Sequence, residues 1–128
     1  MSEFSQTILV VEDDREVRDV ALAVVEGAGY RVLEAASGDD AYRLLLAHPD
    51  LQVDVLFTDV VMPGRLDGVD LAVAARELRP NLRVLFATGF ASLLRNDRET
   101  AIDAPILRKP YRPAELRRAL ALLLDPVS

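Results

Sequence analysis

The sequence of 128 residues contains no cysteine and no long hydrophobic run. Without thiols, neither a disulfide nor a thiolate-bound metal can form, which fits a reducing compartment. No segment approaches the roughly 20 apolar residues of a membrane-spanning helix. The first residues also lack the basic start and apolar stretch of a signal peptide. We therefore expect a cytoplasmic protein that does not insert into a membrane and that is stabilised by packing.

Positive charge is also scarce, because 15 Lys and Arg residues stand against 21 Asp and Glu residues, giving a net charge of −6. Binding to a nucleic-acid backbone depends on clustered Lys and Arg, so we do not expect a nucleic-acid partner. The apolar fraction of 51% and the charged fraction of 28% are ordinary for a globular domain. No repeat, low-complexity tract or linker is present, so the sequence predicts one domain, residues 1–128, with a core over about residues 6–125.

Short apolar runs rich in β-branched residues alternate with segments of helical periodicity. The apolar runs predict five strands. Helices are expected around positions 17–24, 41–45, 71–78 and 116–123, where apolar residues recur at helical spacing. A further helix is expected within residues 91–102, which offer little apolar face. The predicted strands are Ile8–Val11, a run around Val32–Leu33, Val53–Phe57, Val84–Phe86 and a run around Ile106–Leu107.

Strict alternation of strand and helix predicts a parallel sheet with right-handed crossovers and helices on both faces. Continuous apolar strands are typical of such a sheet, because its strands are buried on both sides. The predicted class is therefore doubly wound α/β. Ligands of these folds bind beyond the carboxyl ends of the strands, where the strand order reverses.

Polar side chains stand at the carboxyl ends of four of the five predicted strands. Because parallel strands end at one edge of the sheet, we expect these side chains to form one site. The second strand ends in Glu34-Ala35-Ala36, and we expect it to contribute little. The residues at the other strand ends are Glu12 and Asp13 after the first strand, Asp59 after the third, Thr88 after the fourth and Lys109 after the fifth.

Three carboxylates this close together require a cation to stay ionised, since like charges raise each other's pKa. A set of oxygen ligands without His or Cys suits Mg²⁺, which takes one or two carboxylates together with a phosphate oxygen. We expect Lys109 and Thr88 to meet further phosphate oxygens while an Asp59 oxygen attacks phosphorus. A carboxylate nucleophile that forms an aspartyl phosphate is established chemistry.

Four ordered motifs, which span nearly the whole chain, resemble those of the response-regulator receiver family. This resemblance implies a flavodoxin-like (βα)5 fold with strand order 2-1-3-4-5, in a phosphoprotein of a two-component system. The motifs are Ile-Leu-Val-Val-Glu-Asp-Asp at 8–14, Leu-Phe-Thr-Asp-Val-Val-Met-Pro-Gly at 56–64 with Asp67-Gly68 following, Phe-Ala-Thr-Gly at 86–89 and Leu-Arg-Lys-Pro-Tyr at 107–111.

The resemblance also implies roles for the metal-binding residues. Asp59 corresponds to the phosphoacceptor of the family. Asp13 corresponds to a direct Mg²⁺ ligand, and Glu12 to an acidic partner that acts through water. The backbone carbonyl of Val61 corresponds to another ligand.

Other roles implied by the resemblance concern the phosphoryl group and the output. Thr88 corresponds to the switch hydroxyl and Lys109 to the residue that contacts the phosphoryl group, with Lys109-Pro110 a cis peptide. The sequence departs from the family's pattern at Ile106, where an aromatic switch residue is usual. The Phe-Ala-Thr-Gly stretch resembles the FATGUY receiver subgroup, and the match to receivers that end hybrid histidine kinases is equally good, so both remain open.

The resemblance implies transfer of a phosphoryl group to Asp59 from a histidine kinase or a phosphotransfer protein. The fourth and fifth strands and the helix between them would then shift, and the signal would leave through protein contacts. On this hypothesis the chain is not an enzyme in the ordinary sense, but it catalyses its own phosphorylation and its slow dephosphorylation. Slow loss is expected because Val61 and Phe90, which in the family flank the attacking water, are both apolar.

Each residue of the site also has an ordinary structural explanation. Asp13 or Asp14 could cap the first helix, with Glu16 completing a capping box, and we favour Asp14 as the cap. Asp59 alone is more typical of a turn, and Lys109 alone of a solvated surface charge. Only their joint placement favours a functional site.

Two other classes of function compete with a phosphoacceptor. An aspartate-nucleophile phosphohydrolase would need a second acid two residues after the nucleophile, and Val61 occupies that position. An interaction module that uses the receiver fold without phosphorylation is favoured by Ile106 and disfavoured by the otherwise complete site. Failure to respond to a small phosphodonor would favour this second class.

Overall fold

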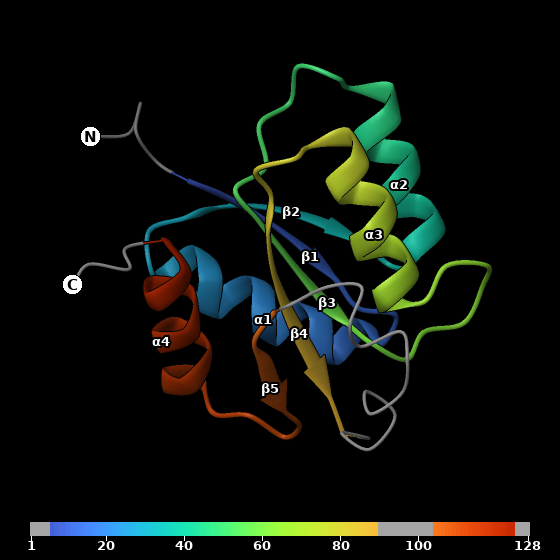
Figure 1. Cartoon of the computed structure of the whole chain (residues 1–128). Coiled ribbons are helices and arrows are strands. Elements are labelled where there is room, and N and C mark those ends of the chain that lie inside the picture. Colours follow the sequence, from blue (N-terminus) through green and yellow to red (C-terminus); the bar gives the residue numbers. More distant parts are fainter. Residues whose placement is uncertain (1–5, 90–103, 125–128) are drawn as a thin grey trace.

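The computed structural model describes residues 6–89 and 104–124, in which strands and helices alternate along the chain (Figure 1). The helix expected within residues 91–102 lies outside these described ranges. No helix in the described ranges is long and apolar enough to cross a membrane. The elements are β1 (Thr7–Val11), α1 (Arg15–Gly27), β2 (Arg31–Ala35), α2 (Gly38–Ala47), β3 (Val55–Asp59), α3 (Gly68–Leu78), β4 (Arg83–Thr88), β5 (Ile106–Arg108) and α4 (Pro113–Leu124).

The five strands form one sheet in the order β2-β1-β3-β4-β5, and every neighbouring pair is parallel. This confirms the predicted doubly wound α/β fold and its strand order. The third strand begins at Val55, two residues later than predicted. Just before this strand, the Asp54 side chain binds the start of β1, because its Oδ2 accepts the Thr7 amide at 2.8 Å.

Helices cover both faces of the sheet, with α2 and α3 on one side and α1 and α4 on the other (Figure 1). Alternate residues of each central strand enter opposite cores, as their side-chain period of two requires. Leu9 packs beneath α2 and α3, whereas Ile8 packs beneath α1 and α4, and both are fully buried. The central strands therefore need apolar residues on both faces, which explains their continuous apolar runs.

Polar caps fix where the helices start beside the carboxyl edge of the sheet. Asp14 is the N-cap of α1, as predicted, and its side chain accepts the Val17 amide at 3.1 Å. A capping box formed by Asp67 and Asp70 opens α3. Both caps lie within a few residues of the predicted site, so they determine how the chain leaves β1 and how it returns after β3.

Candidate functional site

Three carboxylates meet at the carboxyl edge of the sheet, where the sequence predicted a site. Glu12 and Asp13 follow β1, and Asp59 is the last residue of β3. One carboxylate oxygen from each lies within 4.8 Å of the others. Glu12 is buried, Asp59 is half-buried and Asp13 is exposed, so the cluster is closed on the sheet side and open on the Asp13 side.

Lys109 neutralises part of this charge from the end of β5. Its Nζ donates hydrogen bonds to Glu12 Oε1 at 2.7 Å and to Asp59 Oδ2 at 2.9 Å. The three side chains are 23%, 8% and 11% exposed respectively, so these ion pairs are screened little by solvent. One ammonium therefore bridges two carboxylates that come from different strands.

Burial and ion pairing shift the pKa values of both Glu12 and Lys109. Burial raises the pKa of the Glu12 carboxyl, and it outweighs the opposing hydrogen bonds from Lys109 and the Asp14 amide. Burial alone would lower the pKa of Lys109, but its hydrogen bonds to Glu12 and Asp59 raise it. Lys109 is thus held protonated, while the ionised form of Glu12 would gain from a further cation.

The donor set fits a hard divalent cation. It consists of carboxylate oxygens, which Mg²⁺ prefers, and the cluster contains neither His nor Cys. Three carboxylates and one ammonium leave two negative charges, which one divalent ion would balance. Glu12, Asp13 and Asp59 are therefore the residues that could hold Mg²⁺ at this edge.

The other predicted site residues lie at the same edge. Thr88 ends β4 and is buried, and its carbonyl accepts the Lys109 amide at 3.0 Å. Val61 follows Asp59 by two positions, with a side chain that is 44% exposed. The Lys109-Pro110 peptide bond is cis, as predicted. The roles of the Val61 carbonyl and the Thr88 hydroxyl remain predictions, and Phe90 lies outside the described residues.

Gly68 holds the backbone of Asp59 in place, a role that the sequence analysis missed. Gly68 is the first residue of α3, and its amide donates to the Val60 carbonyl at 2.8 Å. A β-carbon at this position would overlap the Asp59 carbonyl oxygen and lie 2.8 Å from Val60 Cα. Only glycine permits this close approach. The Asp67-Gly68 pair was the available signal, since it marks the start of the helix that follows β3.

Replacing Gly68 with alanine is expected to destabilise the protein by about 3 kcal/mol, at the upper end for overpacking, because backbone atoms must move. Urea unfolding would measure this loss. Gly27→Ala is the matched control, since a β-carbon there meets nothing within 4 Å and Gly27 lies in α1. We expect that control to change stability by no more than about 1 kcal/mol. Equal effects of the two substitutions would contradict the close approach at Gly68.

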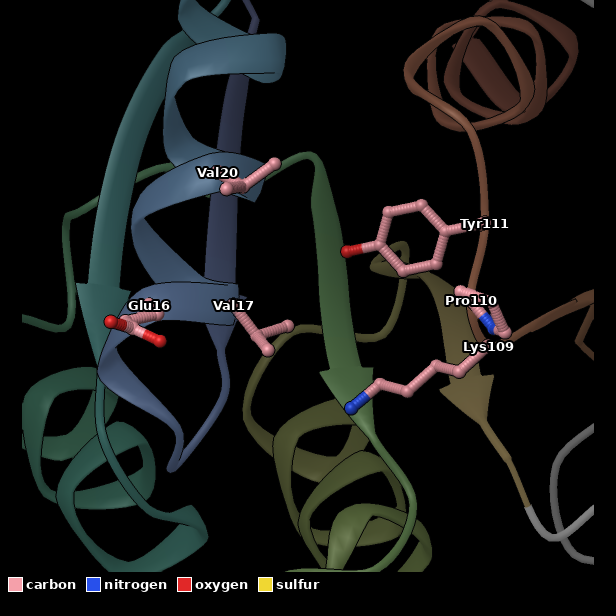
Figure 2. Close-up of a pocket in the computed structure, with 6 residues that line it drawn as sticks. All are labelled: Glu16, Val17, Val20, Lys109, Pro110 and Tyr111. Atoms are coloured by element: carbon pink, nitrogen blue, oxygen red, sulfur yellow. The ribbon is translucent and has the colours of Figure 1, made fainter.

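Tyr111 links the ion pairs to an apolar groove beside the site. Its ring contacts Phe57 of β3 edge-on, with ring centroids 5.8 Å apart. Figure 2 shows the ring between α1 and the segment after β5, where it lines the groove together with the aliphatic stem of Lys109. The groove has a volume of about 450 Å³ and is lined by Glu16, Val17, Val20, Lys109, Pro110 and Tyr111.

Burial raises the pKa of the Tyr111 hydroxyl from 10.0 to about 12, against the opposing charge of Lys109. The folded state therefore holds this proton more tightly than the unfolded chain does. The resulting stabilisation is complete below pH 10 and is lost as the pH rises towards 12. Between about pH 9 and about pH 11.5, we expect the free energy of unfolding of the wild type to fall by roughly 1–2 kcal/mol more than that of Tyr111→Phe, allowing for partial exposure. Urea unfolding of both proteins at both pH values measures this difference. An equal fall in the two proteins would contradict the raised pKa of Tyr111.

Known proteins match this chain over most of its length. Residues 8–121 match the family model of the response regulator receiver domain. The response regulator receiver protein CpdR of Brucella abortus (strain 2308) is 37% identical over 118 residues, which cover 91% of this chain and 95% of that protein. The sensor kinase CckA of the same organism is also 37% identical, over 87 residues that cover 68% of this chain and 9% of the kinase.

Solved structures of receiver domains share the fold of this chain. The receiver domain of the hybrid histidine kinase CckA superposes with a TM-score of 0.78 at 34% identity, covering 93% of this chain and 99% of that domain. A CheY-like receiver domain protein from Methanospirillum hungatei JF-1 superposes with a TM-score of 0.82 at 27% identity, covering 95% of both chains.

Proposed function

Because this chain belongs to the response regulator receiver family of two-component systems, we propose that it accepts a phosphoryl group on Asp59, with Mg²⁺ bound at the carboxylate cluster. The donor we propose is a phosphohistidine of a histidine kinase or a phosphotransfer protein. The observation that carries the proposal is the joint placement of Asp59 beside Glu12, Asp13 and the Lys109 ammonium. Each of these groups has a use in phosphoryl transfer, which depends on positioning and charge neutralisation.

Asp59 is the proposed nucleophile. One of its carboxylate oxygens attacks phosphorus, the phosphorus–nitrogen bond of the phosphohistidine breaks, and the electron pair remains on the imidazole nitrogen, which then takes up a proton from solvent. The product is an acyl phosphate on Asp59. The exposed side of the cluster, at Asp13, leaves room for the donor to approach.

Asp13, Asp59 and the Val61 carbonyl are the proposed direct ligands of Mg²⁺, with Glu12 acting through water. When bound, Mg²⁺ supplies positive charge beside the phosphoryl oxygens. Lys109 already bridges Glu12 and Asp59, so its Nζ needs only to move from a carboxylate oxygen to a phosphoryl oxygen. The Thr88 hydroxyl, at the end of the adjacent strand, is the proposed contact for another phosphoryl oxygen.

We further propose that the chain is not an enzyme acting on a separate substrate. It would catalyse its own phosphorylation and lose the phosphoryl group slowly, because the exposed Val61 side chain offers no hydrogen bond to orient an attacking water. The aspartyl phosphate is expected to persist for minutes or longer. Its decay can be followed by intact mass after removal of the phosphodonor, and a half-life of seconds would contradict slow loss.

The output we propose is protein contact, through a shift of β4, β5 and the segment between them. That segment lies mostly outside the described residues. Ile106, which stands at the start of β5 where an aromatic residue is usual in the family, is 41% exposed. The absence of an aromatic residue at this position favours the second candidate function, an interaction module that binds partners regardless of phosphorylation.

Intact mass after incubation with acetyl phosphate separates the two candidates. We expect the mass of one phosphoryl group to be added in the presence of Mg²⁺ and not in the presence of a chelator. Beryllofluoride is a suitable stable mimic, since the response regulator TrrA of Thermotoga maritima, which shares the fold at 22% identity and a TM-score of 0.80, was solved in complex with Mg²⁺-BeF. If no adduct forms with either reagent, the receiver fold is a passive interaction module.

A further inference from the structure

Arg18 holds the turn that carries Glu12 and Asp13. Its Nη1 donates to the Glu12 backbone carbonyl at 2.8 Å, and its Nε donates to Glu34 Oε1 in β2 at 2.9 Å. The Arg18 side chain is only 14% exposed, although Glu34 is 54% exposed. A planar guanidinium has the fixed fork of donors that such a bridge requires, which a lysine ammonium lacks.

The surrounding backbone shows why this bridge matters for the carboxylate cluster. The Glu12 amide donates to the Ala35 carbonyl at 3.2 Å, so both polar groups of the Glu12 backbone are bound, one by β2 directly and one by Arg18. The Glu12 side chain in turn accepts the Asp14 amide at 3.0 Å through Oε2, while Oε1 accepts Lys109. The end of β2 therefore supports the site, although its sequence suggested that it contributes little.

We infer that Arg18, oriented by Glu34, is a positioning residue for the proposed Mg²⁺ site: it fixes the backbone of the β1–α1 turn so that Glu12 and Asp13 face Asp59. The part of this inference that concerns Mg²⁺ rests on the proposed function. Outer-shell partners of metal ligands commonly change metal affinity by about 10-fold to 100-fold when they are removed. The Arg18 guanidinium bonds the Glu12 backbone carbonyl and the Glu34 carboxylate, which is not part of the cluster, so it acts on the site through the Glu12 backbone.

Charge and positioning predict opposite effects of removing Arg18. Arg18 is a cation near the cluster, so if only its charge mattered, its loss would strengthen Mg²⁺ binding. If it positions the turn, its loss weakens Mg²⁺ binding. Arg15→Met is the matched control for Arg18→Met, because it makes the same charge change on the same helix. The Arg15 side chain is 84% exposed and pairs only weakly with Asp19, at 3.9 Å.

The experiment measures Mg²⁺ affinity by isothermal titration calorimetry for the wild type, Arg18→Met, Arg15→Met and Glu34→Gln. We expect Arg18→Met to weaken binding about 10-fold, Glu34→Gln to weaken it less, and Arg15→Met to leave it unchanged or slightly stronger. Thermal unfolding of each variant confirms that it is folded. Binding by Arg18→Met that is as tight as binding by Arg15→Met overturns the inference.

Amide hydrogen exchange measured by NMR without metal provides a second readout. We expect the Glu12 and Asp14 amides to exchange about 10-fold faster in Arg18→Met than in the wild type and Arg15→Met, because the bond that fixes this turn is lost. Unchanged exchange at both amides overturns the inference whether or not Mg²⁺ binds. If the wild type shows no Mg²⁺ binding, the proposed function fails, and exchange alone then decides whether Arg18 positions the turn. If the wild type binds Mg²⁺, and Arg18→Met exchanges faster but binds Mg²⁺ as tightly as the wild type, then Arg18 is a purely structural residue. That result also overturns the inference.

Discussion

Phosphorylation of an Asp59→Asn chain by acetyl phosphate is expected to be slower than that of the wild type by more than about 1000-fold, as is typical when a nucleophile is removed. No adduct should therefore be detected in the time that phosphorylates the wild type. Asparagine keeps the shape of the side chain but supplies a poor nucleophile, and it also removes one of the two carboxylates that hold Lys109. Intact mass under conditions that phosphorylate the wild type is the measurement. Peptide mapping of the wild-type adduct should place the added mass on the peptide that contains Asp59.

Asp50→Asn is the matched control for this substitution. Asp50 is exposed and lies between α2 and β3, at the opposite end of the sheet from the site. The Asp50→Asn variant should take up a phosphoryl group at the wild-type rate. An adduct of equal amount in Asp59→Asn would show that another residue is the acceptor, and the proposed role of Asp59 would be wrong.

Replacing Lys109 with methionine is expected to slow phosphorylation about 100-fold to 1000-fold, the usual cost of removing one group that stabilises transition-state charge. Methionine keeps most of the apolar stem that lines the groove but removes the ammonium. Mg²⁺ binding should not weaken and should strengthen somewhat, because Lys109 is a cation that already bonds Glu12 and Asp59. Single-turnover phosphorylation and calorimetric Mg²⁺ titration together measure both effects.

Arg108→Met serves as the control for Lys109→Met, since it removes a positive charge from the neighbouring exposed position of β5. It should change the phosphorylation rate by less than about 3-fold, as expected for a screened surface charge. Parallel loss of Mg²⁺ binding and phosphorylation in Lys109→Met would indicate a disrupted site and would contradict the separate role proposed for this side chain.

The carboxylate cluster was predictable from sequence because it depends only on where strands end. Once the apolar runs are assigned to parallel strands, residues that follow them must share an edge, whatever their separation along the chain. Glu12 and Lys109 are 97 positions apart and form a 2.7 Å ion pair. The strand order came from the resemblance to receivers and not from the hydrophobic pattern, since periodicity says nothing about which strands are neighbours.

The support of the site was not predictable in the same way. Gly68 looks like an ordinary residue in the first turn of a helix until the Asp59 carbonyl is seen against it. Arg18 and Glu34 both look like solvated charges on an amphipathic helix and an edge strand, and their bridge to the Glu12 carbonyl depends on the packing of α1 against β2. Such contacts depend on the three-dimensional arrangement of elements and leave no periodic signal.

The ion pairs of Lys109 have a consequence for chemical labelling of this protein. Lys109 is the only lysine in the sequence, and the other residues of the Lys and Arg count are all arginine. An amine-reactive acylating reagent therefore has two possible targets, the amino terminus and the Nζ that bridges Glu12 and Asp59. Because acylation requires the free amine and Lys109 is held protonated and half-buried, the rate of modification at this one side chain would report directly on whether its two carboxylate partners are in place.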